Sequence, residues 1–381
     1  MQELKTRRSG LKAWPVLGIA LMQLLLLAAH WFIYRTWIDF WQPLGPLASL
    51  ALGAVLFLLA FSFIAAALLG FYFSNPLVKL LYRLATVWLG LLNFFFMAAC
   101  LSWLAWFALR LLRLHPNRPL LAAALFGLAA VTGIYGLVNA RLIRIRHIPV
   151  QLAGLPQSWR GRTALVLTDL HLGHINGPRF SRRIAALAAS LNPDVILIPG
   201  DLFDGSGADA EALIAPFRQL TPPCGIYFST GNHDEFGDAD RYAEILSRAG
   251  IRVLANEKVT VDGLDIVGID YADSGYPVRL RTILESLHLV PGRASILLNH
   301  APSRLLIVEQ AGISLQLSGH THSGQLFPFT WLTRRAYGRF TYGLQLFGAL
   351  TVYTSSGAGS WGPPMRVGTR PEIVLLTFEQ A

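Results

Sequence analysis

Four long runs without a charged residue constrain this chain more than any other feature. No Asp, Glu, Lys or Arg occurs in residues 13–34, 40–78, 84–109 or 119–140. Each run exceeds the roughly 20 residues that a helix needs to cross a bilayer. The second run is over-long and contains prolines, so we place its span near residues 47–73. Four such runs in succession are too long for buried helices of a soluble core, and they predict four membrane spans.

The distribution of charge divides the chain at the same place. Residues 1–147 carry 13 Lys and Arg against only Glu3 and Asp39, whereas residues 148–381 carry 19 basic and 20 acidic residues. The net charge of +10 therefore belongs to the apolar part and does not indicate binding to nucleic acid. We expect a transmembrane helical domain in residues 1–147 and a second domain in residues 148–381.

The positions of Lys and Arg beside the spans predict how the protein is oriented. Nine of them flank one side of the membrane and four flank the other. Under the positive-inside rule, the N-terminus and the C-terminal domain lie in the cytoplasm and the spans lie in the inner (plasma) membrane. A cleaved signal peptide fits the first run poorly because no A-x-A-like site follows it. The nine are Lys5, Arg7, Arg8, Lys12, Lys79, Arg83, Arg141, Arg144 and Arg146, and the four are Arg35, Arg110, Arg113 and Arg118.

From about residue 148 the pattern changes to short apolar segments that end in polar residues. Strands are expected in 163–171, 194–205, 225–235, 294–302 and 314–325, with the first strand near Val150 and later ones near 350–354 and 372–378. Helices are expected near 182–191, 208–219, 239–249 and 302–311. This alternation predicts an α/β domain.

Five of these strands end in residues that can bind a metal ion. In open α/β sheets ligands collect beyond the carboxyl ends of the strands, so we expect these side chains to meet at one edge. Imidazole, carboxylate and amide oxygen together suit two divalent ions of Mn, Fe, Zn, Co or Ni, and the absence of thiolates argues against a structural zinc site. Gly319 and Gly324 permit the tight turn of the last motif. The converging residues are Asp169, His171, Asp201, Asn232, His233, His300, His320 and His322.

The same segments resemble the five signature blocks of the calcineurin-like metallophosphoesterases. The blocks read DLH (169–171), GDLFD (200–204), GNHD (231–234), NH (299–300) and GHTH (319–322). The closer resemblance is to the branch whose last block reads GHTHGGQ, in which Ser323 stands where Gly is usual. The resemblance implies an α/β/β/α sandwich of two mixed sheets and hydrolysis of a phosphate mono- or diester or of a pyrophosphate.

The resemblance also implies a role for each site residue. Asp169, His171 and His322 would hold the first metal, and Asn232, His300 and His320 the second. Asp201 would bridge both. His233 would act as the general acid, and Asp234 and Asp204 would orient ligands, although Asp234 could equally cap a helix. Arg366 is expected to contact either phosphate or a surface carboxylate, and His174 to approach the mouth of the pocket.

The substrate and several other classes of function stay open at this stage. A membrane lipid that carries a phosphodiester or pyrophosphate is favoured, with a nucleotide-linked acylated sugar as the candidate that the resemblance implies. A general phosphodiesterase that is merely anchored is the alternative. An inactive sensor module is disfavoured because all seven ligands are present, and a nuclease because the domain lacks a basic excess. The oligomeric state and the metal are not determined by the sequence.

Overall fold

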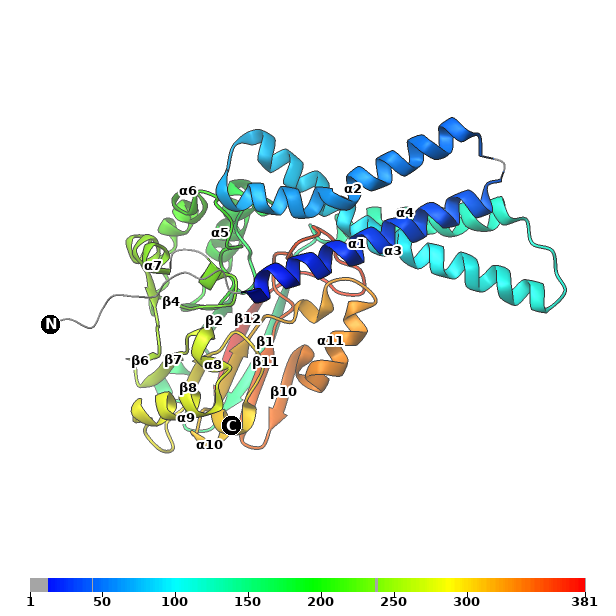
Figure 1. Ribbon diagram of the computed structural model, residues 1–381. Helices are drawn as coiled ribbons and strands as arrows, with labels where there is room; N and C mark the ends of the chain where they lie inside the picture. The colour runs from blue at the N-terminus through cyan, green and yellow to red at the C-terminus, as the bar shows by residue number, and fades with distance from the viewer. Residues whose placement is uncertain (1–12, 43, 237–238, 381) are drawn as a thin grey trace. The chain divides into compact units, whose positions relative to one another are not determined.

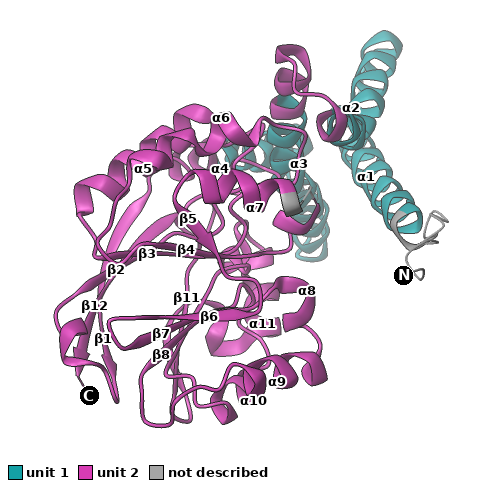
Figure 2. Ribbon diagram, turned by 90° about the vertical axis from the view of Figure 1, so that its left-hand side faces the viewer, with its two compact units in different colours: residues 1–69, 84–133 teal, residues 70–83, 134–381 magenta. Residues whose placement is uncertain are grey.

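The computed structural model describes residues 13–42, 44–236 and 239–380. The chain divides into two compact units, one of residues 1–69 and 84–133 and the other of residues 70–83 and 134–381 (Figure 2). The predicted boundary at residue 147 stays a prediction, because the second unit also takes in 70–83 and 134–147. Four of the residues used to predict the orientation, Lys5, Arg7, Arg8 and Lys12, lie outside the described residues.

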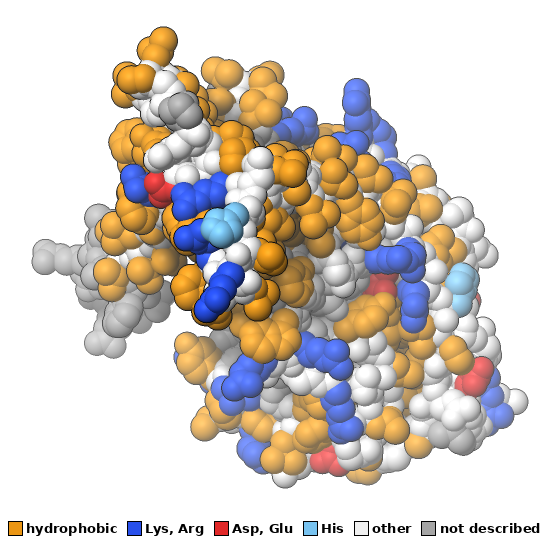
Figure 3. Space-filling view, turned by 90° about the vertical axis from the view of Figure 1, so that its right-hand side faces the viewer, with side chains coloured by type: hydrophobic (Ala, Val, Ile, Leu, Met, Phe, Trp, Pro, Cys, Tyr) orange, Lys and Arg blue, Asp and Glu red, His pale blue; other side chains and the backbone are white. Residues whose placement is uncertain are grey.

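The apolar runs form four long helices, as the sequence predicts. They are α1 (Ala13–Phe40), α2 (Pro46–Tyr72), α3 (Pro76–Leu111) and α4 (Arg118–Asn139). All four are long and apolar enough to cross a membrane. Large hydrophobic side chains remain exposed along them, as the orange surface in Figure 3 shows. Such a surface is stable against lipid and costly in water.

Polar groups within the first unit are paired with one another. The indole nitrogen of Trp88 donates to Nε2 of His30 at 2.9 Å, and that of Trp103 donates to the hydroxyl of Thr36 at 3.0 Å. The side chain of Gln23 donates to the carbonyl of Ala60 at 3.0 Å. These bonds satisfy groups that hydrocarbon cannot solvate.

The described residues of the second unit form twelve strands in two mixed sheets (Figure 1). Its strands are β1 (Arg144–Leu152), β2 (Thr163–Val166), β3 (Val195–Pro199), β4 (Ile226–Ser229), β5 (Ile251–Val253), β6 (Glu257–Val261), β7 (Leu264–Gly268), β8 (Ser295–Leu298), β9 (Leu315–Ser318), β10 (Gly343–Phe347), β11 (Leu350–Thr354) and β12 (Glu372–Gln380). Its helices are α5 (Pro178–Leu191), α6 (Ala210–Ile214), α7 (Ala239–Arg248), α8 (Tyr271–Ser274), α9 (Pro277–Ser286), α10 (Leu305–Gln310) and α11 (Phe329–Tyr337). The strand orders are β1-β12-β2-β3-β4-β5 and β10-β11-β9-β8-β7-β6.

Alternation along the strands produces four layers. In β3, Val195 and Leu197 join the apolar core between the two sheets, while Ile196 and Ile198 pack with residues of α5, α6 and α7. On the other sheet, Leu297 of β8 packs with residues of α9 and α10. Since side chains alternate along a strand, each sheet is buried on both faces. This confirms the predicted α/β/β/α sandwich of two mixed sheets.

The direction of β1 brings the end of α4 to one particular edge of the first sheet. β1 runs parallel to β12, and β12 runs antiparallel to β2, which is parallel to β3 and β4. The amino end of β1 therefore lies at the same edge as the carboxyl ends of β2, β3 and β4. Residues 140–143 alone separate α4 from β1. They can span no more than about 14 Å.

Several elements differ from the prediction. β1 begins at Arg144 rather than near Val150. Strands β5, β6, β7 and β10 and helices α8, α9 and α11 were not expected from the sequence. Most of these are short or mix polar and apolar residues, so their periodicity is weak.

Candidate metal centre

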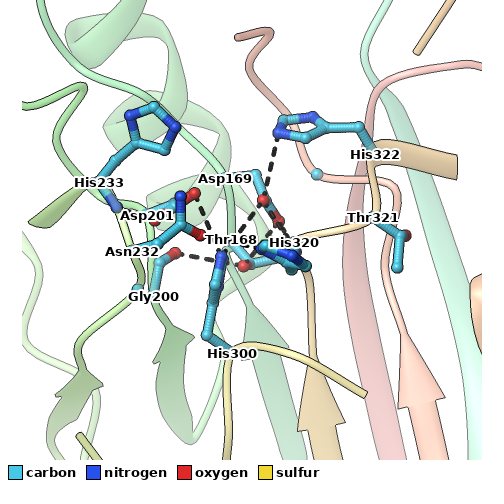
Figure 4. Close-up of polar contacts among 12 residues, drawn as sticks. Thr168, Asp169, Gly200, Asp201, Asn232, His233, His300, His320, Thr321 and His322 are labelled. Carbon is cyan, nitrogen blue, oxygen red and sulfur yellow. Dashed lines mark hydrogen bonds and ion pairs between the residues drawn. The ribbon is translucent and has the colours of Figure 1, made fainter. Parts of the chain in front are cut away.

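Loops from both sheets bring the predicted ligands together at one edge. Asp169 and His171 follow β2, Asp201 follows β3, and Asn232 follows β4. From the second sheet, His300 follows β8, and His320 and His322 follow β9. In Figure 4 the side chains of Asp169, Asp201 and His300 point toward one another above the strand ends. The convergence expected at the carboxyl ends of the strands is therefore present.

The backbone at these positions is unusual. Five of the seven predicted ligands have a positive φ although none is glycine. Such conformations cost of order 1–3 kcal/mol each and cluster at functional sites. The five are Asp169 (51°), His171 (44°), Asp201 (51°), His320 (66°) and His322 (45°).

Two glycines leave room for this packing. A Cβ on Gly319 would overlap the carboxylate of Asp169, and a Cβ on Gly324 would overlap the backbone of Thr330. Gly324 also has a φ of 82°, which favours glycine. Both positions predicted to permit the tight turn therefore require a residue without a side chain.

One group of donors consists of Asp169, His171 and His322, whose ligand atoms lie within 4.8 Å of one another. The Nε2 atoms of His171 and His322 are 2.9 Å apart. Nε2 of His322 is 3.3 Å from Oδ1 of Asp169, and Nε2 of His171 is 3.6 Å from Oδ2 of Asp201. Asp201 therefore also faces this group.

A second group lies beside the first. Asp169, Asp201 and His300 meet the same distance criterion, and Nε2 of His300 is 3.1 Å from Oδ2 of Asp201. Nδ1 of His320 is 2.9 Å from Oδ1 of Asn232. The carboxylates of Asp201 and Asp169 each face imidazoles of both groups. The bridging role of Asp201 stays a prediction.

The donor atoms face one another in a way that requires a cation. Nδ1 of His300 lies 2.8 Å from the carbonyl of Pro199, which fixes the ring proton there. The lone pair of Nε2 then points at a carboxylate oxygen of Asp201, and two acceptors at this distance need a proton or a metal ion between them. A set of imidazoles, carboxylates and one amide oxygen suits first-row divalent ions. These residues therefore fit two divalent metals.

Burial sets the protonation of the imidazoles. Burial lowers the pKa of His171 to about 3 and the pKa of His320 to about 4, and it lowers the pKa of His322 well below its usual range. These rings are neutral at pH 7, which is the form that binds metals. Burial also raises the pKa of Asp169 to about 6.

When a proton rather than a metal ion lies between Nε2 of His300 and Asp201, the two residues form a buried ion pair. Burial alone opposes charge on both groups, but His300 and two other histidines hold the pKa of Asp201 below its usual range. The carboxylates of Asp201 and Asp169 in turn raise the pKa of His300 to about 9. Negative charge is thus concentrated on Asp201, at the centre of the ligand set.

His233 lies at the rim of the centre, on the side opposite His322 (Figure 4). Its backbone N–H donates to Oδ1 of Asp201 at 2.9 Å, and its Nδ1 is 3.3 Å from the carbonyl of Asp204. Its ring meets that of His171 edge-on, with centroids 4.7 Å apart. The ring is half-buried, so one edge can reach a substrate. The distances also allow His233 to join a group with His171 and Asp201.

Both carboxylate oxygens of Asp234 accept hydrogen bonds from backbone N–H groups. Its Oδ2 accepts from the backbone N–H groups of Asp201 and Gly231, both at 2.8 Å, and its Oδ1 accepts from that of Phe203 at 2.9 Å. Burial raises the pKa of Asp234 to about 7. Asp234 therefore joins the loops after β3 and β4, which is a positioning role.

Asp204 also positions a loop. Its carboxylate accepts from the backbone N–H groups of His174 at 3.2 Å and Ser206 at 2.9 Å. The loop after β2 is thereby attached to the loop after β3.

Arg366 lies away from the surface. It is completely buried, so it does not form a surface salt bridge, and its contact with phosphate stays a prediction. Its guanidinium donates to the carbonyl of His322 at 3.1 Å, lies 3.1 Å from Nδ1 of the same ring, and contacts the carbonyls of Gly357 and Gly359. Arg366 therefore positions His322 through both the backbone carbonyl and Nδ1 of that residue.

His174 is buried. Its Nε2 lies 2.7 Å from the carbonyl of Gly70, and its own carbonyl accepts from Nε of Arg83 at 3.1 Å. Gly70 lies in the last turn of α2, and Arg83 lies in the first part of α3. His174 therefore attaches the ends of these two helices to the loop after β2, and its approach to the mouth of the pocket stays a prediction.

One residue near the centre was not singled out from the sequence. The hydroxyl of Thr168 donates to Oδ2 of Asp169 at 2.9 Å. Oδ1 of Asp169 accepts from the backbone N–H of His320 at 2.9 Å. These bonds fix the carboxylate. The only signal for Thr168 was its place directly before the first motif.

Comparisons with known proteins agree with this geometry. Residues 162–324 match the family described as calcineurin-like phosphoesterase. A Danio rerio protein named transmembrane protein with metallophosphoesterase domain is 35% identical over 67% of this chain and 62% of its own length. An uncharacterised metallophosphoesterase of Campylobacter jejuni is 32% identical over 65% of this chain and 66% of its own length. The chain thus covers less than two thirds of either relative.

Among solved structures, one titled "GAP50 the anchor in the inner membrane complex of Plasmodium" aligns with a TM-score of 0.33 and 14% identity. The alignment covers 55% of this chain and 76% of that chain. This likeness is too weak to inform fold or function.

Proposed function

Because the chain carries a calcineurin-like metallophosphoesterase domain, we propose that it is a membrane-bound, metal-dependent hydrolase that cleaves a phosphoester or pyrophosphate bond. Members of this family use two divalent metal ions, and the described residues contain groups that could hold them. The observation that carries the proposal is the placement of Asp201, whose carboxylate faces imidazoles of both groups. A shared carboxylate is what a two-metal phosphoesterase centre requires.

One proposed ligand set is the first group, in which Asp169, His171 and His322 would hold one ion. The other set would consist of His300 from the second group together with Asn232 and His320, and Asp201 would be shared. When bound, the two ions supply Lewis acidity toward the phosphoryl oxygens and lower the pKa of the attacking water. Burial keeps the rings of His171, His320 and His322 neutral, and neighbouring histidines keep the carboxylate of Asp201 ionised. The pKa of His300 is instead raised by the carboxylates of Asp201 and Asp169.

His233 is the proposed general acid. Its backbone is fixed to Asp201, and its Nδ1 faces the carbonyl of Asp204. This arrangement leaves Nε2 directed away from Asp204, where it can deliver a proton to the leaving oxygen. Asp204 and Asp234 position the loops that hold it.

We further propose that the substrate is a lipid with the scissile phosphorus in its headgroup. The direction of β1 supports this, because it puts the end of the membrane helix α4 at the edge of the sheet where the ligands gather. The carboxyl end of α2 supports it as well: the carbonyl of Gly70 accepts from the backbone N–H of Gly207 at 3.1 Å and lies 2.7 Å from Nε2 of His174. Ends of three membrane helices thus belong to the same compact unit as the catalytic loops.

Among such lipids, a nucleotide-linked acylated sugar is the leading candidate. The proposed site of action is the inner (plasma) membrane, with the catalytic unit in the cytoplasm. The nine-to-four excess of Lys and Arg supports this orientation.

A hydrolysis assay of the full-length chain in mixed micelles tests both proposals. The protein is first treated with a chelator, and Mn and other divalent metals are then added back one at a time. Activity should vanish on chelation and return with metal. If the chelated protein retains full activity, the two-metal hydrolase is wrong.

The lipid proposal is tested by surface dilution. The bulk concentration of a lipid pyrophosphate is held constant while its mole fraction in the micelle is lowered. The rate should fall with mole fraction, and water-soluble diesters should be cleaved with at least ten-fold lower kcat/KM. If soluble diesters are cleaved as efficiently as the lipid, the spans are only an anchor for a general phosphodiesterase.

A further inference from the structure

A basic pocket lies beside the metal centre and takes no part in the proposed reaction. It has a volume of about 380 Å³, and all of its lining residues belong to the second unit. Three arginines, Arg144, Arg146 and Arg370, line it together with Tyr135 and Ser323.

Two of the arginines lie at the exposed end of the edge strand β1. Ile148, Val150 and Leu152 of β1 face the core between the sheets. Because side chains alternate along a strand, Arg144 and Arg146 lie on the same face of β1 as this row, where the strand becomes exposed. Two cations on one wall of a pocket attract a ligand of opposite charge.

The protein itself supplies little of that opposite charge. Among the described residues, none of the three guanidinium groups makes an ion pair or a side-chain hydrogen bond. The single acidic residue on the pocket wall, Glu372, is buried. Its carboxylate accepts from the hydroxyls of Tyr342 at 2.6 Å and Tyr353 at 3.0 Å, and from two serine groups. The pocket therefore has an excess of positive charge.

Ser323 adds a hydroxyl to the pocket, although its backbone conformation is less favourable for serine than for glycine. Its φ is 51°, in the left-handed region that favours glycine. It is also the position at which the chain departs from the glycine of the related motif. A serine kept there at a conformational cost lines the pocket beside the arginines.

The depth of the pocket relative to the bilayer follows from Tyr135. This residue lies four positions before the end of α4, which corresponds to about 6 Å along the helix axis. Tyrosine is enriched where a span leaves the hydrocarbon. The headgroup layer on each side of a bilayer is about 5–8 Å thick, so the pocket is at headgroup depth.

We propose that this pocket binds the phosphate group of an anionic lipid headgroup, separately from the catalytic centre. Guanidinium groups recognise phosphate through paired hydrogen bonds, and the hydroxyls of Ser323 and Tyr135 supply two further donors. Ser323 follows the predicted ligand His322, and Ser356 on the opposite wall precedes Gly357, which packs against Asp169. An occupied pocket therefore stabilises two loops that also form the metal centre.

The test uses the full-length chain in neutral detergent, treated with a chelator so that the catalytic centre cannot bind phosphate through metals. Calorimetric titrations are made with short-chain phosphatidic acid, with inorganic phosphate and with short-chain phosphatidylcholine. Phosphatidic acid should bind saturably and at least ten-fold more tightly than inorganic phosphate, and phosphatidylcholine should bind no more tightly than inorganic phosphate.

Three variants locate the binding. Combined Arg144→Gln and Arg370→Gln substitutions should weaken binding at least ten-fold. Ser323→Gly should weaken it a few-fold, as expected for one lost hydrogen bond, and it cannot disrupt the fold because glycine accepts this φ more readily. The matched control is Arg160→Gln, an exposed arginine of the same unit outside the pocket, which should bind normally.

Equal affinity for inorganic phosphate and phosphatidic acid would contradict the proposal that the bound phosphate belongs to a lipid, and it would identify a site for soluble phosphate. The proposal as a whole is wrong if neither ligand binds saturably, or if Arg160→Gln weakens binding as much as the double variant does. In that case the arginines of β1 serve only to keep this edge strand from pairing with other chains.

Discussion

At the scale of single residues, the carboxylate of Asp201 is in contact with residues from three different loops. It faces His300 and His171, and it accepts the backbone N–H of His233. Loss of its charge should therefore disturb both metal groups and the general acid together.

We expect Asp201→Asn to abolish hydrolysis and to remove at least one metal ion per chain. The amide keeps the shape of the side chain but removes the charge that both groups share. Elemental analysis and turnover on the same sample measure the two effects. Asp262→Asn is the control, because Asp262 is in an exposed ion pair with Arg162, and such pairs contribute little. Two bound metals and normal turnover in Asp201→Asn would rule out a shared carboxylate.

We expect His233→Ala to retain its metals but to lose about 10²–10⁴-fold in kcat on alkyl esters. The loss should be smallest for substrates with acidic leaving groups, since these need little protonation. Parallel assays of aryl and alkyl esters measure the difference. Equal losses on both would mean that His233 does not act as an acid.

We expect Arg366→Lys to lower the free energy of unfolding by about 2 kcal/mol or more, because a buried lysine cannot replace several charged hydrogen bonds. Metal content should fall as well, since the guanidinium positions His322. Denaturant unfolding and elemental analysis provide the readouts, with exposed Arg160→Lys as the control. Unchanged metal content despite lower stability would limit Arg366 to a structural role.

At the scale of secondary-structure elements, the strands that carry ligands were predictable from the sequence. β2, β3, β4, β8 and β9 are short apolar runs that end in Asp, Asn or His, and this pattern alone implies a common edge. The long apolar helices were also predictable, because runs of more than about 20 residues without a charged side chain are rare outside membrane spans.

Other elements could not be predicted for physical reasons. The apolar residues of β1 do not stay on one face, because Ile145 alternates out of step with Ile148, Val150 and Leu152, and its partner β12 is distant in the sequence. The positions of Arg366 and His174 depend on segments that fold together from distant parts of the chain. Arg366 contacts His322 and Gly357, and His174 contacts Gly70. No local pattern encodes these contacts.

The pairing of β1 predicts how fragments of the chain behave. A fragment of residues 148–381 lacks Arg144 to His147, which pair with Glu372 to Leu375 of β12. We expect this fragment to aggregate because part of β12 becomes an unpaired edge. A fragment of residues 141–381 keeps all of β1 and should yield more monomer by size-exclusion chromatography. Equal monomer yields from the two would show that the first half of β1 contributes little.

At the scale of the whole molecule, the orientation in the membrane can be tested with single cysteines. Cys100 and Cys224 are replaced, and a cysteine is introduced at Ser190, an exposed position on α5. An impermeant reagent should label it only after the cells are opened. A cysteine at His115, exposed in the connection between α3 and α4, is the matched control and should react in intact cells. The reverse pattern would place the catalytic unit outside.

The position of β12 in the first sheet has a consequence for synthesis on the ribosome. β12 lies between β1 and β2, yet it is translated after β3 to β11. At roughly 5–20 residues per second, a gap between β1 and β2 persists for on the order of ten seconds or longer. During this interval α4 is already available for insertion, while two strands beside it have open edges. Arg366, which contacts His322, is also translated late. The metal centre can therefore take its final form only when β12 closes the sheet.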